Sequence, residues 1–489
     1  MRAPVVIAGG GPVGLVASIA LSDLSVPNIV VEKDVDVYGL PRAIVMDAEV
    51  RYALERLGLA SQLSEVLAPM VAADFVRPSG ETVSRIVLSD VQLFGCPAVS
   101  KHFQPMLDAL LREEAAARGG QMVFGRTVVS HGVDTQTITC VLDDGTSVSG
   151  DFLLGCDGAS SRTRKSQGIA LEDLGFDQDW LVVDLRLHDR ISAGLPDVTR
   201  QICDPKRPTT LVSGFADYYR FEFQLQPGED PQAMTSDESV WRLLAPYVDR
   251  GKAEVVRRAT YRFHAVVAER MHDGRILLVG DSAHQMPPFM GQGLNSGMRD
   301  AFNLAWKLAY VHRGWCDERL LATYSAERIP HARSTVLQSV ETGRLIDQIA
   351  GRESHGVSES AAYGGERRTN AYEDGVVIAG GPLVGQPYPF INRHGDVPRD
   401  AFIVLFDLAR AKTGNVDVES LARGALGAVP IVVRAVDRMS TLGNDAAIIR
   451  PDGYVAACCE LTSLATVLTK LRTLLCVRDV ASEATAPRR

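Results

Sequence analysis

The sequence has few cysteines and no spacing that is typical of a metal site. Eight cysteines occur in 489 residues and none forms a CxxC pair, although Cys458 and Cys459 are adjacent. The HxxxH spacing of many zinc enzymes is also missing. We therefore expect no bound metal and a reducing, cytoplasmic location.

Long apolar runs and basic tracts are missing as well. The N-terminal apolar segment is broken by Gly9-Gly10-Gly11-Pro12 and lacks a cleavage-site pattern, so it reads as a strand and not as a signal peptide. The net charge is −9 without a basic cluster, which argues against nucleic acid and membrane partners. The length predicts two or three domains of ordinary globular composition.

A glycine motif near the N-terminus predicts a dinucleotide site. Gly9, Gly11 and Gly14 follow a short apolar strand at residues 4–8, at GxGxxG spacing, and open an apolar helix. A second strand, NIVVE, ends at Glu32, which would accept hydrogen bonds from ribose hydroxyls. Gly9 permits the tight turn, Gly11 lets the backbone approach a pyrophosphate, and Gly14 allows close helix–strand packing. The motif alone does not separate NAD from FAD, and a flexible loop is the plain alternative.

The stretch from Gly280 to Leu308 predicts a second ligand-binding turn. It follows the apolar run RILLVGD, passes through Pro287-Pro288 and two glycines, and continues as an amphipathic helix. A strand, a glycine-rich turn and a helix N-terminus can together bind an anionic or polarised ring. One dinucleotide motif together with a second ligand-binding turn far along the chain suits a long cofactor such as FAD.

With GCDGASSRTR at 155–164, these motifs resemble those of the single-component FAD-dependent aromatic hydroxylases, the group that includes para-hydroxybenzoate hydroxylase. Within this group the chain is most similar to 3-(3-hydroxyphenyl)propionate hydroxylases and, less so, to polyketide hydroxylases. The segments PRAIVMD at 41–47, WLVVDL at 180–185 and YSAERIPHA at 324–332 carry the likeness. It covers residues 3–345 and resumes at IIRPDGYVAA (448–457).

The resemblance implies FAD as the cofactor and NADH or NADPH as co-substrate. The implied contacts to the ADP half are Gly9, Gly11, Pro12, Val13, Gly14, Glu32 and Lys33, with Arg42 at the pyrophosphate or ribose and Val128 at the adenine. The implied contacts further along FAD are Gln104 and Asp281 at the ribityl chain, Asp157 and Gly158 between FAD and the nicotinamide, and Pro288, Gly291, Gly293, Leu294 and Asn295 at the flavin ring. Ser160 departs from the Arg or His that the family often has, which leaves the nicotinamide side open.

Two residues are candidates for catalysis. Hydroxylation is faster on a phenolate, so a group that accepts the phenol proton is expected. Asp47 lies just after the PRA segment, at a position where the resemblance to phenol-type hydroxylases implies an acid near the substrate hydroxyl. Its alternative role is to cap the helix that begins at Ala48. The resemblance also places Arg220 near the flavin, whereas a surface pair with Glu222 is the alternative. His284 reads as structural.

The implied reaction is hydroxylation of a phenolic or aromatic substrate with NAD(P)H and O2 through a flavin hydroperoxide. Two alternatives stay open: Baeyer–Villiger or epoxidation chemistry on a polycyclic substrate with the same fold, and a catalytically silent FAD-binding module. Flavin-dependent halogenation is disfavoured because the four tryptophans are isolated and form no WxWxIP signature. The sequence does not specify the aromatic substrate or the oligomeric state, for which a homodimer is one option.

The expected fold is α/β. A Rossmann-like FAD-binding domain at 1–175 and 271–350 would be interleaved with a β-sheet substrate domain at 176–270. A linker at 351–375, a thioredoxin-like domain without CxxC at 376–478 and a tail at 479–489 would follow.

Overall fold

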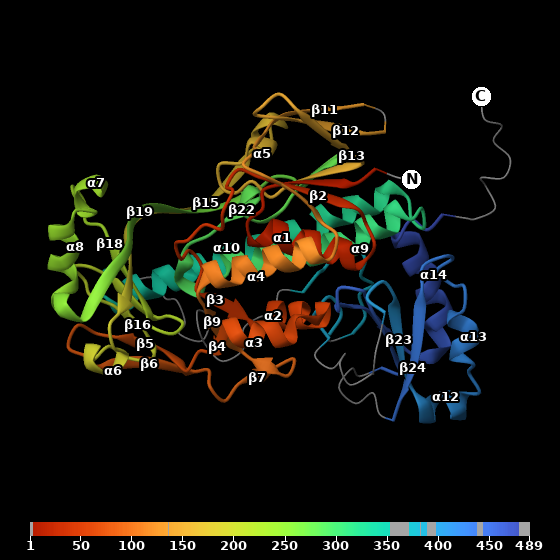
Figure 1. Ribbon diagram of the computed structural model, residues 1–489. Helices are drawn as coiled ribbons and strands as arrows, with labels where there is room; N and C mark the ends of the chain where they lie inside the picture. The colour runs from red at the N-terminus through yellow and green to blue at the C-terminus, as the bar shows by residue number, and fades with distance from the viewer. Residues whose placement is uncertain are drawn as a thin grey trace.

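Two large sheets lie side by side along the molecule, with two long helices following one another across its middle and a smaller domain at one end (Figure 1). The computed structural model describes residues 3–134, 136–352, 371–381, 383–388, 398–437 and 444–478. Its mixed α/β architecture confirms the predicted fold class. The expected linker lies mostly outside the described residues, and the expected tail lies wholly outside them.

The first sheet has six strands and is mainly parallel. Its order is β10 (Gln121–Phe124), β2 (Asn28–Glu32), β1 (Val5–Ala8), β14 (Phe152–Gly155), β21 (Ile276–Leu278) and β20 (His272–Asp273), and only β20 is antiparallel to its neighbour. The strands β1, β14 and β21 are buried throughout, as parallel strands covered on both faces must be. The two strands predicted near the N-terminus are confirmed.

Helices cover this sheet and continue from it. The helices α1 (Pro12–Asp23), α4 (Gln104–Ala117) and α9 (Gly293–His312) pack together on one face. The antiparallel strands β11 (Val128–Val133), β12 (Ile138–Leu142) and β13 (Ser147–Gly150) form a separate sheet whose buried residues pack on the other face. The helix α10 (Ala322–Ile349) follows α9 after a break, where Gly314 has a φ of +74° and Asp317 caps the next turn.

The second sheet has eight strands, of which β15 (Leu171–Leu187) and β19 (Ala253–Ala268) are the longest. Its order is β22 (His284–Gln285), β19, β15, β18 (Tyr218–Gln224), β17 (Thr209–Ser213), β16 (Thr199–Ile202), β5 (Ala72–Val76) and β6 (Thr82–Val87). This corrects the predicted limits of the substrate sheet, since β5 and β6 come from the part assigned to the FAD-binding domain. Strand β5 joins this sheet through a parallel pairing with β16, a long-range contact that no local sequence pattern predicts.

One face of this sheet is closed by its own helices. Odd-numbered residues of β18, such as Phe221 and Phe223, are buried against Val240 and Leu244 of α8 (Asp237–Leu244). The even-numbered residues of β18 therefore point to the opposite face. Arg220 on that face hydrogen-bonds the loop at Pro41 and Arg42, so this face is turned toward the FAD-binding part.

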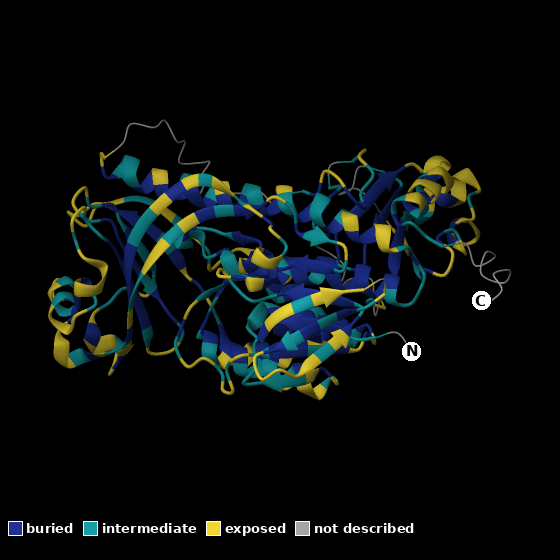
Figure 2. Cartoon of the chain, turned by 90° about the horizontal axis from the view of Figure 1, so that it is seen from above, coloured by how far each residue is buried: buried dark blue, intermediate teal, exposed yellow. Residues whose placement is uncertain are grey.

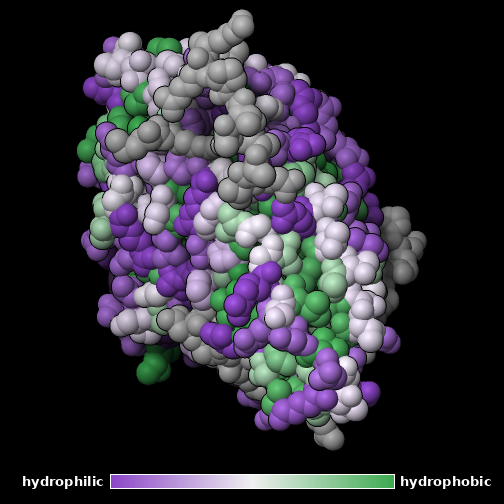
Figure 3. All heavy atoms as spheres, turned by 90° about the vertical axis from the view of Figure 1, so that its right-hand side faces the viewer, coloured by the Kyte–Doolittle hydropathy of each residue, from purple (hydrophilic) through white to green (hydrophobic). Residues whose placement is uncertain are grey.

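The C-terminal part contains a four-stranded mixed sheet with helices beside it. Its order is β24 (Ile431–Val436), β23 (Phe402–Asp407), β25 (Ala446–Ile449) and β26 (Val455–Cys459), with β23 and β24 parallel. The helices are α12 (Leu408–Gly414), α13 (Val418–Ala422) and α14 (Leu464–Leu474). The likeness of this part to thioredoxin stays a prediction. Figure 3 shows hydrophobic and hydrophilic residues intermixed over this end of the molecule.

Short elements complete the chain. They are β3 (Val45–Asp47), β4 (Leu67–Pro69), β7 (Gln92–Leu93), β8 (Cys96–Pro97), β9 (Val99–His102), α2 (Ala48–Leu54), α3 (Ala60–Val66), α5 (Arg162–Ser166), α6 (Arg190–Ala193) and α7 (Pro231–Met234). Buried residues fill the middle of the molecule, and exposed residues gather on its outer strands and helices (Figure 2). Across the described ranges, no helix is both long and apolar enough to cross a membrane.

Candidate cofactor and substrate site

The three predicted motifs meet at one edge of the six-stranded sheet. Ala8 is level with Val31 and with Gly155, and Gly155 is level with Leu278, so β2, β1, β14 and β21 end together. Glu32 is the last residue of β2, and the glycine motif, Asp157 and Asp281 follow the ends of β1, β14 and β21. Ligands of open parallel sheets bind at the carboxyl ends of the strands. Gly11 and Asp281, which are 270 residues apart in the sequence, therefore lie at the same edge of the sheet.

The glycine motif forms a cradle with open space in front of Gly11. A Cβ atom on Gly9 would overlap the carbonyl oxygen of Cys156, and one on Gly14 would overlap that of Gly9. A Cβ on Gly11 would meet nothing within 4 Å. Gly9 and Gly14 thus allow the backbone to pack, while Gly11 leaves room at the N-terminus of α1 for a phosphate group. These residues fit the pyrophosphate of FAD.

Glu32 stabilises the cradle from the next strand. Its two carboxylate oxygens accept hydrogen bonds from the backbone N–H of Gly10 at 2.6 Å and of Asp34 at 2.9 Å. Each carboxylate oxygen has a further lone pair that a ribose hydroxyl could use. Lys33 is exposed and forms an ion pair with Asp34 at 2.5 Å.

The second and third motifs are hydrogen-bonded to each other. Asp157 accepts from Ser161 Oγ at 2.5 Å and from the N–H of Thr163 at 2.9 Å, which folds the turn containing Gly158. The Arg164 guanidinium donates to the carbonyl oxygen of Ser282 at 3.1 Å, and Ser282 Oγ donates to that of Gly155 at 2.6 Å. Asp157 therefore holds its own turn in place, and that turn is fixed against the one that carries Asp281.

Asp281 lies on the wall of this edge. Its side chain keeps contact with solvent, and the protein groups around it partly desolvate the carboxyl and raise its pKa above the usual value. Beneath it, His284 Nε2 lies 2.8 Å from Asp300, whose other oxygen accepts from Arg328 at 2.6 Å. The histidine is buried, which agrees with the structural role predicted for it.

The turn before α9 is tied to strand β3. Asn295 Nδ2 donates to the carbonyl oxygens of Gly291 at 2.8 Å and of Val45 at 3.2 Å, and its Oδ1 accepts from the N–H of Asp47 at 3.0 Å. Gly291 has a φ of +62° and faces Val45 so closely that a Cβ would lie 2.8 Å from the valine Cβ. A rigid turn thus leads into Gly293, the first residue of α9.

Other predicted contact residues surround the same edge. Gln104 accepts from the N–H of Ala43 at 2.6 Å, and the Arg42 guanidinium lies 4.2 Å from the ring centroid of Tyr38. Val13 packs between the two motifs, since a Cβ on Gly297 would lie 2.7 Å from it. The remaining ones are Pro12 at the start of α1, buried Val128 on β11, Pro288 in the turn, and Leu294 packed on the main core.

Asp47 is buried and engaged by other protein groups. It is the N-cap of α2 and accepts from the N–H of Val50 at 3.0 Å, which confirms the capping interpretation. Its second oxygen forms an ion pair with Arg299, which also binds Glu49 at 2.9 Å. The catalytic role of Asp47 stays a prediction.

The Asp47→Asn and Asp47→Ala variants separate the two roles. Asparagine keeps a capping oxygen, so we expect Asp47→Ala to lose about 1 kcal/mol more stability than Asp47→Asn in urea unfolding. The pH profile of hydroxylation should be measured in both variants, with flavin reduction measured separately. Unchanged coupling in Asp47→Asn would leave the carboxylate with a structural role only.

Arg220 belongs to a buried charge cluster and not to a surface pair. It binds Asp184 of β15 through two hydrogen bonds, at 2.7 and 3.1 Å, and donates to the carbonyl oxygen of Arg42 at 2.5 Å. Arg257 of β19 lies 3.5 Å from the same aspartate and also bonds the carbonyl of Pro41. The surface alternative for Arg220 and Glu222 is therefore wrong, because both lie on the inner face of the sheet. Sequence reasoning missed Asp184 and Arg257, whose only signal was strand alternation.

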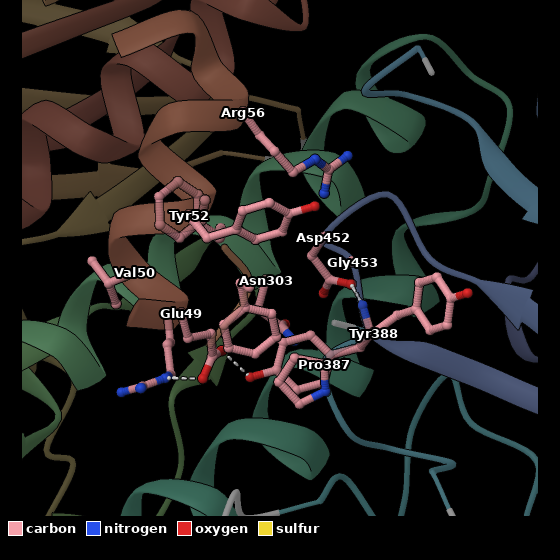
Figure 4. A pocket seen from close by; sticks show the side chains of 14 residues that line it. Glu49, Val50, Tyr52, Arg56, Asn303, Pro387, Tyr388, Asp452 and Gly453 are labelled. Atoms are coloured by element: carbon pink, nitrogen blue, oxygen red, sulfur yellow. Dashed lines mark hydrogen bonds and ion pairs between the residues drawn. The ribbon is translucent and has the colours of Figure 1, made fainter. Parts of the chain in front are cut away.

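A separate small pocket lies away from the strand ends, between α2, α9 and the C-terminal domain (Figure 4). Glu49 and Tyr52 reach it from α2, and Tyr388 and Asp452 reach it from the other side. The Glu49 carboxylate accepts a hydrogen bond from Tyr454 across this boundary. None of the predicted cofactor residues lines the pocket, so it marks the junction of two domains.

Comparison with known proteins identifies the family of this chain. The sequence profile of the FAD binding domain family matches residues 2–339. The chain is 34% identical over 350 residues to a probable NADH-specific resorcinol 4-hydroxylase of Rhodococcus jostii (strain RHA1), covering 70% of this chain and 65% of the relative. It is 33% identical over 412 residues to a 3-(3-hydroxy-phenyl)propionate/3-hydroxycinnamic acid hydroxylase of Burkholderia cenocepacia (strain HI2424), covering 79% and 75%.

Two solved structures share the fold over nearly the whole chain. Aklavinone-11 hydroxylase in complex with FAD and aklavinone superposes with a TM-score of 0.81 at 22% identity, covering 96% of this chain and 99% of that one. The flavin-dependent monooxygenase PieE in complex with FAD and substrate gives 0.80 at 23% identity, covering 97% and 99%.

Proposed function

The chain belongs to the FAD-binding family that includes these aromatic hydroxylases, and we propose that it uses NADH and O2 to hydroxylate a phenol carrying a second polar substituent. The observation that carries the proposal is the meeting of the three motifs at the ends of four adjacent strands, opposite the charged inner face of the second sheet. The names of the two relatives support the substrate class, and the name of the Rhodococcus jostii relative supports the choice of NADH.

FAD binding fits the residues at this edge. The open space at Gly11 and the N-terminus of α1 would hold the pyrophosphate, and Glu32 the ribose. Asp281 and Gln104 would contact the ribityl chain, and the turn from Pro288 to Asn295 would bind the flavin ring. When bound, FAD supplies hydride acceptance from the nicotinamide and the activation of oxygen.

The protein's part is to place the phenol and to keep water out. The Phe289 ring from the turn packs edge-on against Trp180 of β15 with centroids 5.4 Å apart, which closes one side with apolar groups. Arg220 closes another side by its bonds to the loop at residues 41–42. A dry, charged site of this kind strengthens electrostatic contacts to a phenolate.

The test is a single set of assays on purified protein. We expect bound FAD, NADH oxidation that speeds up on adding resorcinol or 3-(3-hydroxyphenyl)propionate, and a product that has gained one oxygen atom by mass spectrometry. NADH oxidation without a hydroxylated product from any phenol would contradict the hydroxylase proposal. Oxygen insertion into a polycyclic ketone would favour the Baeyer–Villiger alternative.

A cytoplasmic location and a homodimer complete the proposal. All eight cysteines are free thiols, which suits a reducing compartment. Light scattering of the purified protein tests the dimer, and a monomer at micromolar concentration would contradict it.

A further inference from the structure

Glu222 is a buried carboxylate on the inner face of the second sheet. Its strand neighbours across the ladder are Val182 of β15 and Thr210 of β17. Residues directly opposite one another share a face, so Glu222 shares its face with Arg220, Asp184 and Trp180. This is the face turned toward the FAD-binding part.

The carboxylate of Glu222 has no hydrogen-bond partner among the residues that the structure describes. The nearest cation is Arg220, whose Nη1 lies 4.0 Å from Oε1 of Glu222. The shorter hydrogen bonds of Arg220 go to Asp184 and to the loop at residues 41–42. Glu222 is only 6% exposed. Buried carboxylates are normally hydrogen-bonded, so one that has only a 4.0 Å ion pair and keeps some exposure is suited to a hydrogen-bond donor that arrives with a ligand.

The surroundings place Glu222 between the two loops that border the cofactor edge. Along β18 it follows Arg220, which bonds the carbonyl oxygens of Pro41 and Arg42. On its other side, Gln224 is level with Trp180, which packs against Phe289 of the turn before α9. A ring that lay between these loops would face the Glu222 carboxylate.

We propose that Glu222 is the group that binds the phenolic hydroxyl of the substrate and accepts its proton, an assignment that rests on the proposed hydroxylase function. The phenol O–H bond breaks, the proton passes to a carboxylate oxygen of Glu222, and the electron pair stays on the phenolate oxygen. The negative charge thereby moves from Glu222 to the substrate, beside the Arg220 guanidinium. Solvent takes the proton from Glu222 when the product leaves.

The charges around Glu222 suit this transfer near neutral pH. Burial raises the pKa of Glu222 to about 7, with Asp184 raising it further and Arg220 and Arg257 lowering it. These groups come from β18, β15 and β19, and the facing residue of β17 is the neutral Thr210. A base works best when its pKa lies near the working pH.

The Glu222→Gln variant tests the assignment, because glutamine keeps the shape and removes the proton acceptor. We expect FAD affinity and NADH-dependent flavin reduction to stay unchanged, while product formation in a single turnover slows by about 100-fold or more. Glu222→Asp should restore part of the rate. The exposed Glu254→Gln on β19 of the same sheet is the matched control and should react as wild type.

A binding measurement tests Glu222 apart from turnover. Near-UV difference spectra of FAD-loaded wild type with resorcinol, taken near neutral pH, should show a phenolate band that Glu222→Gln lacks. A wild-type spectrum of neutral phenol only would overturn the proposal even if the variant did not fold. A loss of coupling in Asp47→Asn together with normal coupling in Glu222→Gln would overturn it in favour of Asp47.

Failure of the proposed function would look different. Wild-type protein would then hydroxylate no phenol at all, while the phenolate band would still report on Glu222.

Stability also distinguishes a folding defect. The raised pKa means that Glu222 stabilises the fold less as pH rises from 4.5 through about 7, so Glu222→Gln should gain in melting temperature relative to wild type over this range.

Discussion

A Gly14→Ala variant is expected to be unstable and free of FAD, whereas a Gly11→Ala variant is expected to fold normally and to lose only FAD affinity. The two glycines belong to one motif but meet different surroundings. A methyl group on Gly14 overlaps the carbonyl oxygen of Gly9 and pushes α1 away from the sheet, while a methyl group on Gly11 enters open space. Overpacking of this kind costs about 1–3 kcal/mol and disorders the cradle.

The measurements are urea unfolding of the apoprotein and titration with FAD. Gly11→Ala should unfold with the wild-type midpoint and bind FAD at least about tenfold more weakly, which corresponds to about 1.4 kcal/mol. A matched control is Gly132→Ala on β11, where a Cβ also meets nothing within 4 Å but no cofactor contact is expected. Wild-type FAD affinity in Gly11→Ala would mean that the pyrophosphate does not lie in front of this residue.

Replacing Glu327 with glutamine is expected to destabilise the whole protein by about 3–5 kcal/mol, as removal of one member of a buried ionic cluster does. Glu327 of α10 is fully enclosed and accepts from Lys307 of α9 at 2.8 Å and from Arg450, after β25, at 2.9 Å. It also accepts from the N–H of Val376 at 2.8 Å. The variant leaves Lys307 buried without a counter-charge and loosens the C-terminal domain from the helices that carry the cofactor turn.

The stabilisation by Glu327 depends on pH in a defined direction. Burial opposes its ionisation, but the charges of Arg450 and Lys307 outweigh this and lower its pKa from 4.5 to about 2. A depressed acidic pKa stabilises the fold above the unfolded value, so the contribution of Glu327 is complete above pH 4.5 and is lost as the pH falls to about 2. Burial lowers the pKa of Lys307 to about 8 even though Glu327 raises it.

Urea unfolding at several pH values measures both effects. The difference between wild type and Glu327→Gln should shrink as the pH falls below 4.5. The control is Glu172→Gln, which breaks the exposed pair of Glu172 with Arg333 on the same helix and should change stability by about 0–1 kcal/mol. Equal effects of the two substitutions would show that the buried cluster adds nothing.

The sequence alone determined the cofactor-binding half of this protein. Its glycines at positions 9, 11 and 14 and the strand that ends at Glu32 form the predicted turn and pairing, because tight turns and parallel strands have local residue requirements. The capping role of Asp47 was also within reach of sequence reasoning, since an N-cap is set by the residues next to it.

Only the tertiary structure decided which charged residues lie on the inner face of the second sheet. Arg220 and Glu222 read equally well as a surface pair. The long-range pairing of β18 with β15, and of β15 with β19, turned both inward and brought Arg220 together with Asp184 and Arg257. The same holds for β5 in the second sheet and for Glu327 beside Arg450. Strand alternation gives two faces without saying which one is buried, and a buried charge is tolerated only where distant residues supply its partner.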